Sequence, residues 1–98
     1  MLPVAVDAMG GDAAPGPILA GAHRAAASGI PVVLVGPADL DGRVAPDGSV
    51  LDLIEASEVI GMHDDPAQGV RRKKDSTLVR AAEAVRDGKA SAMISAGN

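Results

Sequence analysis

The 98-residue sequence contains no cysteine and no phenylalanine, tyrosine or tryptophan. The absence of cysteine excludes disulfide scaffolds, thiolate zinc sites and a cysteine nucleophile. Without aromatic side chains, the core has to be built from small and branched aliphatic residues, each of which buries less area. Basic residues are also few: the chain has 9 Lys and Arg against 13 Asp and Glu, which gives a net charge of −4. This balance argues against a general nucleic-acid binder.

Long hydrophobic runs are missing as well. No apolar stretch approaches the roughly 20 residues that span a bilayer, and Asp7 and Asp12 interrupt the apolar stretch that a signal peptide would need. Hydrophobic residues nevertheless make up 47% of the chain, which is a globular composition. We therefore expect a single globular unit in the cytoplasm, with no internal repeat or linker.

The first third of the chain predicts a β-α-β unit. Residues 4–7 form a short apolar segment that is typical of a buried strand. Pro15 then suits the start of a helix that Gly29 ends. The β-branched run over residues 30–36 predicts a second buried strand, parallel to the first and reached by a right-handed crossover.

The remaining residues continue the alternation. We expect a strand within residues 50–55, a helix that begins near residues 64–66, and a final strand over residues 90–95. Before that final strand, Asp75 or Ser76 predicts the N-cap of a helix that ends at Gly88. Its apolar residues share one face: Leu78, Val79, Ala82 and Val85. The fold class is therefore α/β, with an open, mostly parallel sheet and covering helices.

The loop after the first strand is the first candidate site. Two carboxylates, Asp7 and Asp12, flank the glycine pair Gly10 and Gly11. Glycine lets the backbone approach a ligand closely, and ligands of open α/β sheets bind beyond the carboxyl ends of the strands. A plain tight turn is the alternative interpretation. The loop matches neither the dinucleotide fingerprint nor the P-loop.

The second candidate is the basic run of residues 71–74, which leads directly into a helix N-terminus. Free N–H groups, the helix dipole and the Ser76 hydroxyl would suit a phosphate dianion. Asp75 opposes this hypothesis, because its carboxylate would compete for the same N–H groups. The alternative is a solvated basic face, or a charge balance for Asp64 and Asp65.

The third candidate is the turn that contains Ser95, Gly97 and Asn98, whose side chains and backbone can donate hydrogen bonds to an oxyanion. The two histidines, His23 and His63, are far apart and have no ligand partner at helical spacing. We therefore expect no metal site.

Four segments, residues 6–12, 59–62, 72–76 and 95–98, occur in an order and at separations that resemble the bacterial phosphate acyltransferase (PlsX) family. Each motif is weak alone, but their combination is specific, and the resemblance covers essentially the whole chain. It implies transfer of a fatty acyl group from acyl carrier protein to inorganic phosphate, which gives an acyl phosphate for phospholipid synthesis.

The resemblance also implies an architecture. Residues 1–98 would form the N-terminal part of a single larger α/β catalytic domain, whose fold resembles isocitrate and isopropylmalate dehydrogenases and is truncated here. The full-length protein would be a homodimer without cofactor or metal. It would work at the inner face of the membrane, next to a membrane acyltransferase, and the 98 residues alone would be inactive.

Within this resemblance, motif position and side-chain chemistry suggest a role for each candidate residue. Catalytic roles fall to Lys73, Lys74, Ser76 and Asn98. Substrate-binding roles fall to Asp7, Gly10, Gly11, Asp12, Ser95 and Gly97. Three alternatives stay open: residues 71–74 dock the acidic acyl carrier protein instead of phosphate, the chain is a nicotinamide-dependent dehydrogenase of the related fold, or it is a non-catalytic fragment that binds anions or a partner.

Overall fold

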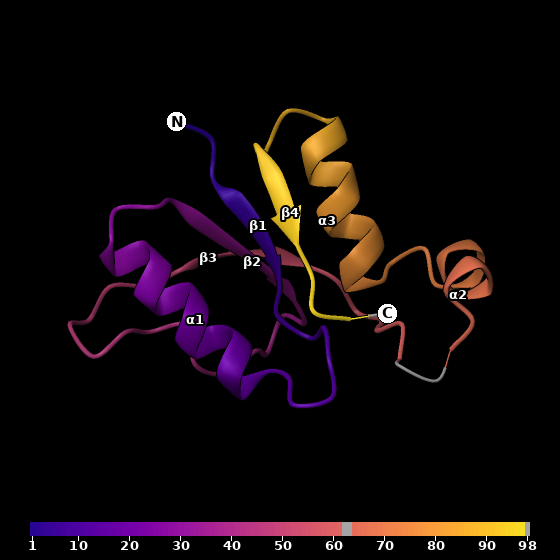
Figure 1. Ribbon diagram of the computed structural model, residues 1–98, viewed down its shortest axis with the longest axis horizontal. Helices are drawn as coiled ribbons and strands as arrows, with labels where there is room; N and C mark the ends of the chain where they lie inside the picture. The colour runs from indigo at the N-terminus through magenta and orange to yellow at the C-terminus, as the bar shows by residue number, and fades with distance from the viewer. Residues whose placement is uncertain (62–63, 98) are drawn as a thin grey trace.

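The computed structural model describes residues 1–61 and 64–97. Its centre is a parallel sheet with the strand order β3-β2-β1-β4 (Figure 1). The strands are β1 (Val4–Asp7), β2 (Val32–Gly36), β3 (Asp52–Glu55) and β4 (Ala92–Ile94). This arrangement confirms the predicted α/β class with an open parallel sheet. Because β1 lies between β2 and β4, the first strand of the chain is an interior strand.

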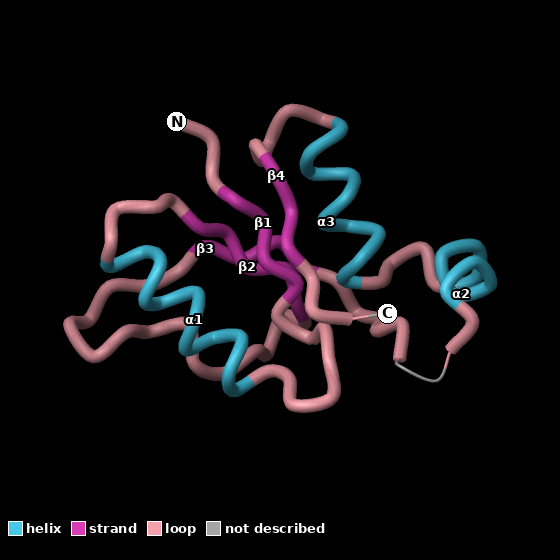
Figure 2. Tube along the Cα trace, viewed as in Figure 1, coloured by secondary structure: helices cyan, strands magenta, loops and turns pink. Residues whose placement is uncertain are grey.

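The described residues form three helices: α1 (Gly16–Ala27), α2 (Pro66–Arg72) and α3 (Thr77–Arg86). Helices α1 and α3 cover opposite faces, while α2 lies outside the sheet layers (Figure 2). The predicted helix ends are confirmed, because Ser76 is the N-cap of α3 and the glycines after α1 and α3, Gly29 and Gly88, have positive φ. None of the helices in the described residues has the length and apolar character that a membrane span requires.

Two hydrophobic clusters hold these layers together. The cluster under α3 joins Val33 and Val35 of β2 to Ala81 and Ala84 of the helix. The cluster under α1 joins Leu34, which points to the other face of the same strand, to Leu19 and Ala22. Alternating β2 residues therefore serve both faces, as expected for a strand that is buried on both sides.

The packed face of α3 differs from the predicted apolar face. Thr77, Ala81 and Ala84 are its buried residues. The predicted face is only partly covered: Leu78 and Val79 are half-buried, and Ala82 and Val85 are exposed. Small side chains allow a helix to approach a sheet closely, so the sheet selects the side with alanines rather than the side with the larger aliphatic residues. The predicted helix is confirmed, but its most apolar side does not face the sheet.

Candidate functional site

The strand order reverses between β1 and β4. The chain runs from β1 to β2 and β3 on one side, then crosses through α3 to β4 on the other side of β1. In open α/β sheets, ligands bind at the carboxyl ends of the strands where such a reversal occurs. The loop after β1 and the turn after β4, both selected from the sequence, lie at this position.

A chain of hydrogen bonds joins the two segments; we call Asp7, Gly10, Ser95 and Gly97 the Asp7 junction. Asp7 is 4% exposed. Its Oδ1 accepts a bond of 3.1 Å from the Met9 N–H, and its Oδ2 accepts one of 2.8 Å from the Ser95 hydroxyl. The Ser95 Oγ in turn accepts a 3.1 Å bond from the Gly97 N–H. Linked bonds of this kind polarise and strengthen one another.

Glycine is required where the two segments meet. A Cβ on Gly10 would lie 2.7 Å from the Ser95 Oγ and 3.0 Å from the Gly97 N. Gly11 has a φ of +93°, which disfavours other residues, and its Cβ position lies 3.3 Å from the Ala96 carbonyl oxygen. These glycines allow a close approach of the β4 turn, through the Ser95 side chain and the backbone of residues 96–97. The predicted approach of a ligand stays a prediction.

The Asp7 junction therefore acts first as a support. The single hydroxyl proton of Ser95 is directed to Asp7, so in this arrangement it does not reach a substrate oxygen. Asp12 lies in the same loop with its side chain exposed. Of the six predicted substrate-binding residues, five come together here: Asp7, Gly10, Gly11, Ser95 and Gly97.

The N-terminus of α3 is held by the segment that follows β3. The Glu58 N–H donates to the Asp75 carbonyl and the Thr77 N–H to the Glu58 carbonyl, each at 3.0 Å. Ser76 is fully buried, and its Oγ accepts a 3.1 Å bond from the Val79 N–H. The Ser76 hydroxyl thus caps the helix.

Asp75 does not cap the helix and so does not compete for its N–H groups. Its carboxylate accepts bonds from the Ser57 hydroxyl and backbone N–H and from the Arg80 Nε, which lies 2.6 Å away. The Ser57 hydroxyl, together with the Arg80 guanidinium, lowers the pKa of Asp75 to about 2. Arg80 also bonds Glu83 at 3.0 Å.

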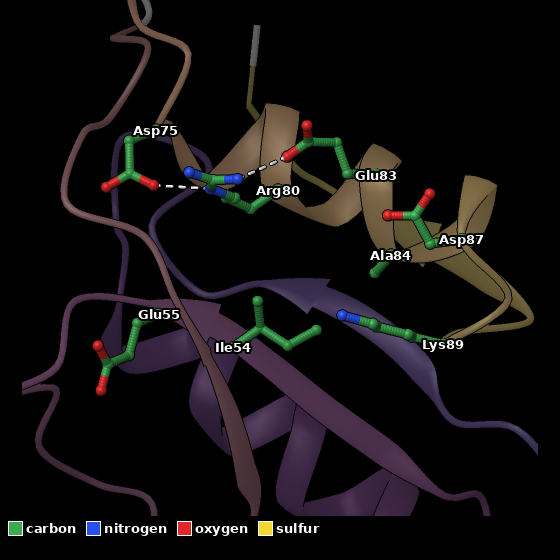
Figure 3. Close-up of a pocket in the computed structure, with 8 residues that line it drawn as sticks. All are labelled: Ile54, Glu55, Asp75, Arg80, Glu83, Ala84, Asp87 and Lys89. Carbon is green, nitrogen blue, oxygen red and sulfur yellow. Dashed lines mark hydrogen bonds and ion pairs between the residues drawn. The ribbon is translucent and has the colours of Figure 1, made fainter.

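This network lines an open groove of about 260 Å³ between β3 and α3 (Figure 3). Four carboxylates and two cations face it: Glu55, Asp75, Glu83, Asp87, Arg80 and Lys89. An excess of carboxylates repels a phosphate dianion, so this groove does not suit the predicted anion.

The basic run divides into one engaged cation and three exposed ones. The Lys73 Nζ lies 2.9 Å from Asp64 Oδ2 and 2.9 Å from the Val59 carbonyl oxygen. The predicted charge balance with Asp64 is thereby confirmed for Lys73, whereas Asp65 caps α2. Arg71, Arg72 and Lys74 are exposed and form no ion pair within residues 1–61 and 64–97.

The connection between α2 and α3 thus contains Lys73, Lys74 and Ser76. These three residues take no part in the hydrogen bonds of the Asp7 junction. The predicted catalytic Asn98 lies outside the described residues, as do Met62 and His63. Sequence reasoning missed Ser57, Glu58 and Arg80. Ser57 and Glu58 carry no local signal, because 18 and 17 residues separate them from the groups they bind.

No group of three potential metal ligands occurs in the part of the chain that the structure describes. His23, the histidine within that part, has its Nε2 2.6 Å from the Gly42 carbonyl oxygen. It therefore joins α1 to the loop before β3.

Comparisons with known proteins agree with the resemblance. The family model described as "Fatty acid synthesis protein" matches residues 2–98. A phosphate acyltransferase of Anaeromyxobacter sp. (strain K) is 50% identical over 98% of this chain and 28% of its own length. For the phosphate acyltransferase of Geobacillus thermodenitrificans, identity is 48% over 97% of this chain and 30% of the relative. That of Desulfitobacterium hafniense (strain Y51) is 46% identical over 100% of this chain and 30% of its own length.

The chain thus spans less than a third of the length of the curated relatives it matches. The matches cover both segments of the Asp7 junction and the basic run together, in one continuous similarity. On this basis, the chain belongs to the phosphate acyltransferase (PlsX) family.

Proposed function

We propose that the chain is part of an enzyme that transfers a fatty acyl group from acyl carrier protein to inorganic phosphate. A phosphate oxygen forms a bond to the thioester carbonyl carbon, the carbon–sulfur bond breaks, and the sulfur takes up a proton to leave as the carrier thiol. The products are an acyl phosphate and free acyl carrier protein. Family membership supports this reaction, as does the position of the Asp7 junction at the reversal of strand order.

The Asp7 junction is the observation that carries the proposal, because it fixes one wall of a site beyond the carboxyl ends of β1 and β4. Asp7 and Ser95 are positioning residues that hold the loop and the turn together. Gly10, Gly11 and Gly97 would line the wall, with Asp12 at its exposed side. A fixed wall matters because holding phosphate and thioester in a reactive geometry supplies much of the rate enhancement.

The phosphate dianion needs cations as well. Lys74 is the exposed lysine next to the N-terminus of α3, so we place it on phosphate. Lys73 would act from its position beside Asp64, and Ser76 through the helix that it caps. Asn98 would complete the site as a hydrogen-bond donor to the oxyanion that develops on the thioester carbonyl.

We also propose that residues 1–98 contribute one part of a single larger α/β domain with an isocitrate/isopropylmalate dehydrogenase-like fold. The relatives are more than three times as long, and the outer edge of β4 pairs with no strand of the described residues. Ile94 on that strand is 60% exposed. The complete protein would be a homodimer that works without a cofactor, in the cytoplasm at the inner face of the membrane, and would pass its product to a membrane acyltransferase.

The experiment is a chimera in which this chain replaces the matching segment of the Geobacillus thermodenitrificans relative. Acyl phosphate is measured by mass spectrometry and free carrier thiol by titration, over a range of phosphate concentrations and without added nicotinamide. Phosphate-dependent formation of both products supports the proposal. A requirement for nicotinamide would favour the dehydrogenase alternative, and phosphate binding without turnover would favour the non-catalytic one.

Within this chimera we predict that Lys74→Ala raises the KM for phosphate about 10-fold or more and changes kcat little, because a bond to a charged group contributes roughly 1.5–3 kcal/mol. Lys89→Ala is the matched control, since Lys89 is an exposed lysine in the other groove. An unchanged phosphate dependence in Lys74→Ala would remove Lys74 from the site.

A further inference from the structure

The outward face of α3 carries larger apolar side chains than the face that packs on the sheet. Leu78, Val79 and Ala82 line an open groove of about 370 Å³, and Val70 of α2 forms its other side. Val70 is 45% exposed, and Val85, on the same side of α3 as Leu78, is 36% exposed. Exposed apolar surface that is gathered between two helices is typical of an interaction site.

The charged side chains that line this groove balance each other, since they are Glu83 and Arg86. Arg86 also binds Asp87 at 2.8 Å, so the free positive charge next to the groove comes from α2, where Arg71 follows Val70 directly. The carboxylate that lines the groove, Glu83, is already paired, with Arg80 at 3.0 Å and Arg86 at 3.8 Å. Arg71 and Arg72 lack an ion pair in the described part of the chain, so their charges are free to attract an acidic partner. Arg72, the last residue of α2, lines the adjoining groove on the other side of that helix.

We propose that the α2–α3 groove docks an acidic amphipathic helix of a partner protein, with the apolar side of that helix against Val70, Leu78 and Ala82 and its carboxylates against Arg71 and Arg72. A helix that lies in an apolar groove is a recurrent mode of recognition. The combination explains why a chain with a net charge of −4 keeps unpaired cations next to its exposed aliphatic residues. Complementary charges there raise the rate of encounter and fix orientation.

A helix fits this surface better than an anionic membrane does. The surface is a groove between two helices, whereas a bilayer needs a protruding apolar face.

The proposal deepens the proposed function, because an enzyme that takes its acyl group from a carrier protein has to dock that protein. The probe is therefore unacylated acyl carrier protein, which can bind to the surface but cannot react. Its dissociation constant with this chain is measured by calorimetry at low and high salt. The double variant Arg71→Glu/Arg72→Glu is expected to bind about 10-fold more weakly. The matched control Arg24→Glu/Lys89→Glu changes the net charge equally at exposed positions elsewhere and is expected to bind within about twofold of the parent.

A third variant tests the groove itself. Ala82→Arg adds a cation but fills the space between α2 and α3, so it is expected to weaken carrier binding about fivefold in spite of its charge. Ala82 is exposed, and circular dichroism of each variant checks that the fold is retained. Stronger binding of Ala82→Arg would show general attraction and overturn the docking mode.

Other results also decide the question. The proposal is overturned by absent binding to the parent chain, by equal loss in the control double variant, by preferential binding to phosphatidylglycerol vesicles, or by a dimer of the chain that buries this face. In the chimera, turnover with an unchanged KM for acyl carrier protein in Arg71→Glu/Arg72→Glu would overturn the docking site and leave the proposed function intact. Carrier binding that depends on Arg71 and Arg72 in a chimera without turnover would support the docking site and count against the function.

Discussion

The Asp7 junction and the basic run of residues 71–74 contain the polar motifs that attract attention in the sequence, yet they are built in opposite ways. In the junction, Asp7 is buried and Ser95 half-buried, and their polar groups satisfy one another in a chain from the Gly97 N–H through Ser95 to Asp7. In the basic run, Lys73 is bound to Asp64 while Arg71, Arg72 and Lys74 remain exposed. The comparison teaches that a polar motif can serve the position of the backbone or the binding of a partner, and that hydrogen-bond satisfaction distinguishes the two.

The largest effect on this comparison is expected when the Asp7 carboxylate, the central acceptor of the junction, is removed. Asp7→Ala leaves the Met9 N–H and the Ser95 hydroxyl, both half-buried, without their acceptor, so we expect a loss of roughly 1–3 kcal/mol in the free energy of unfolding. Asp7→Asn keeps one acceptor oxygen and should lose less. Urea denaturation measures both. A change below about 0.5 kcal/mol in Asp7→Ala, the level of ordinary surface substitutions, would show that the junction is not a structural support.

A similar or smaller effect is expected from the glycine that lets the two segments meet. Gly10→Ala places a methyl group 2.7 Å from the Ser95 Oγ, and the resulting displacement should cost about 1–3 kcal/mol. Gly21→Ala is the control, because no atom lies within 4 Å of its Cβ position and alanine favours the interior of α1. The control should stabilise the protein by roughly 0.5–1 kcal/mol. Equal effects of the two substitutions would contradict the close approach.

The smallest effect concerns the residue that separates the basic run from α3. The folded pKa of Asp75 is about 2, below its ordinary value of 3.8, so its contribution to stability is fully present above pH 3.8 and is lost as the pH falls toward 2. We therefore expect the stability difference between the parent and Asp75→Asn to be constant from pH 7 to about pH 4 and to shrink below that. Urea midpoints at several pH values check this. A difference that persists unchanged at pH 2 would contradict the pKa assignment.

Local patterns were sufficient to predict the elements. The β-branched run that became β2 and the cap at Ser76 are signals carried by neighbouring residues. The packed face of α3 was not predictable in this way, because the sheet accepts Ala81 and Ala84 for their small size rather than for their hydrophobicity. Periodicity alone favours the side with Leu78, which packs less closely.

The candidate site likewise has a part that the sequence predicts and a part that it does not. The sequence indicates that Asp7 and Ser95 follow strands, and parallel pairing then places both at one edge of the sheet. That the Ser95 proton goes to Asp7 depends on atomic distances that no spacing rule contains. The bond between Ser57 and Asp75 was not predicted for the same reason, since β3 has to be placed before the two residues can meet.

The interior position of β1 has a consequence for the order of events during synthesis. Asp7 leaves the ribosome before its partner Ser95, which follows 88 residues later. At a synthesis rate of about 5–20 residues per second, roughly 4–18 s pass between the synthesis of Asp7 and that of Ser95, whose hydroxyl the Asp7 carboxylate binds. Until then, one side of β1 has no neighbouring strand, because β4 has not been made. During translation the nascent chain therefore exposes one unpaired edge of β1. The Asp7–Ser95 hydrogen bond can form only when β4 pairs with that edge.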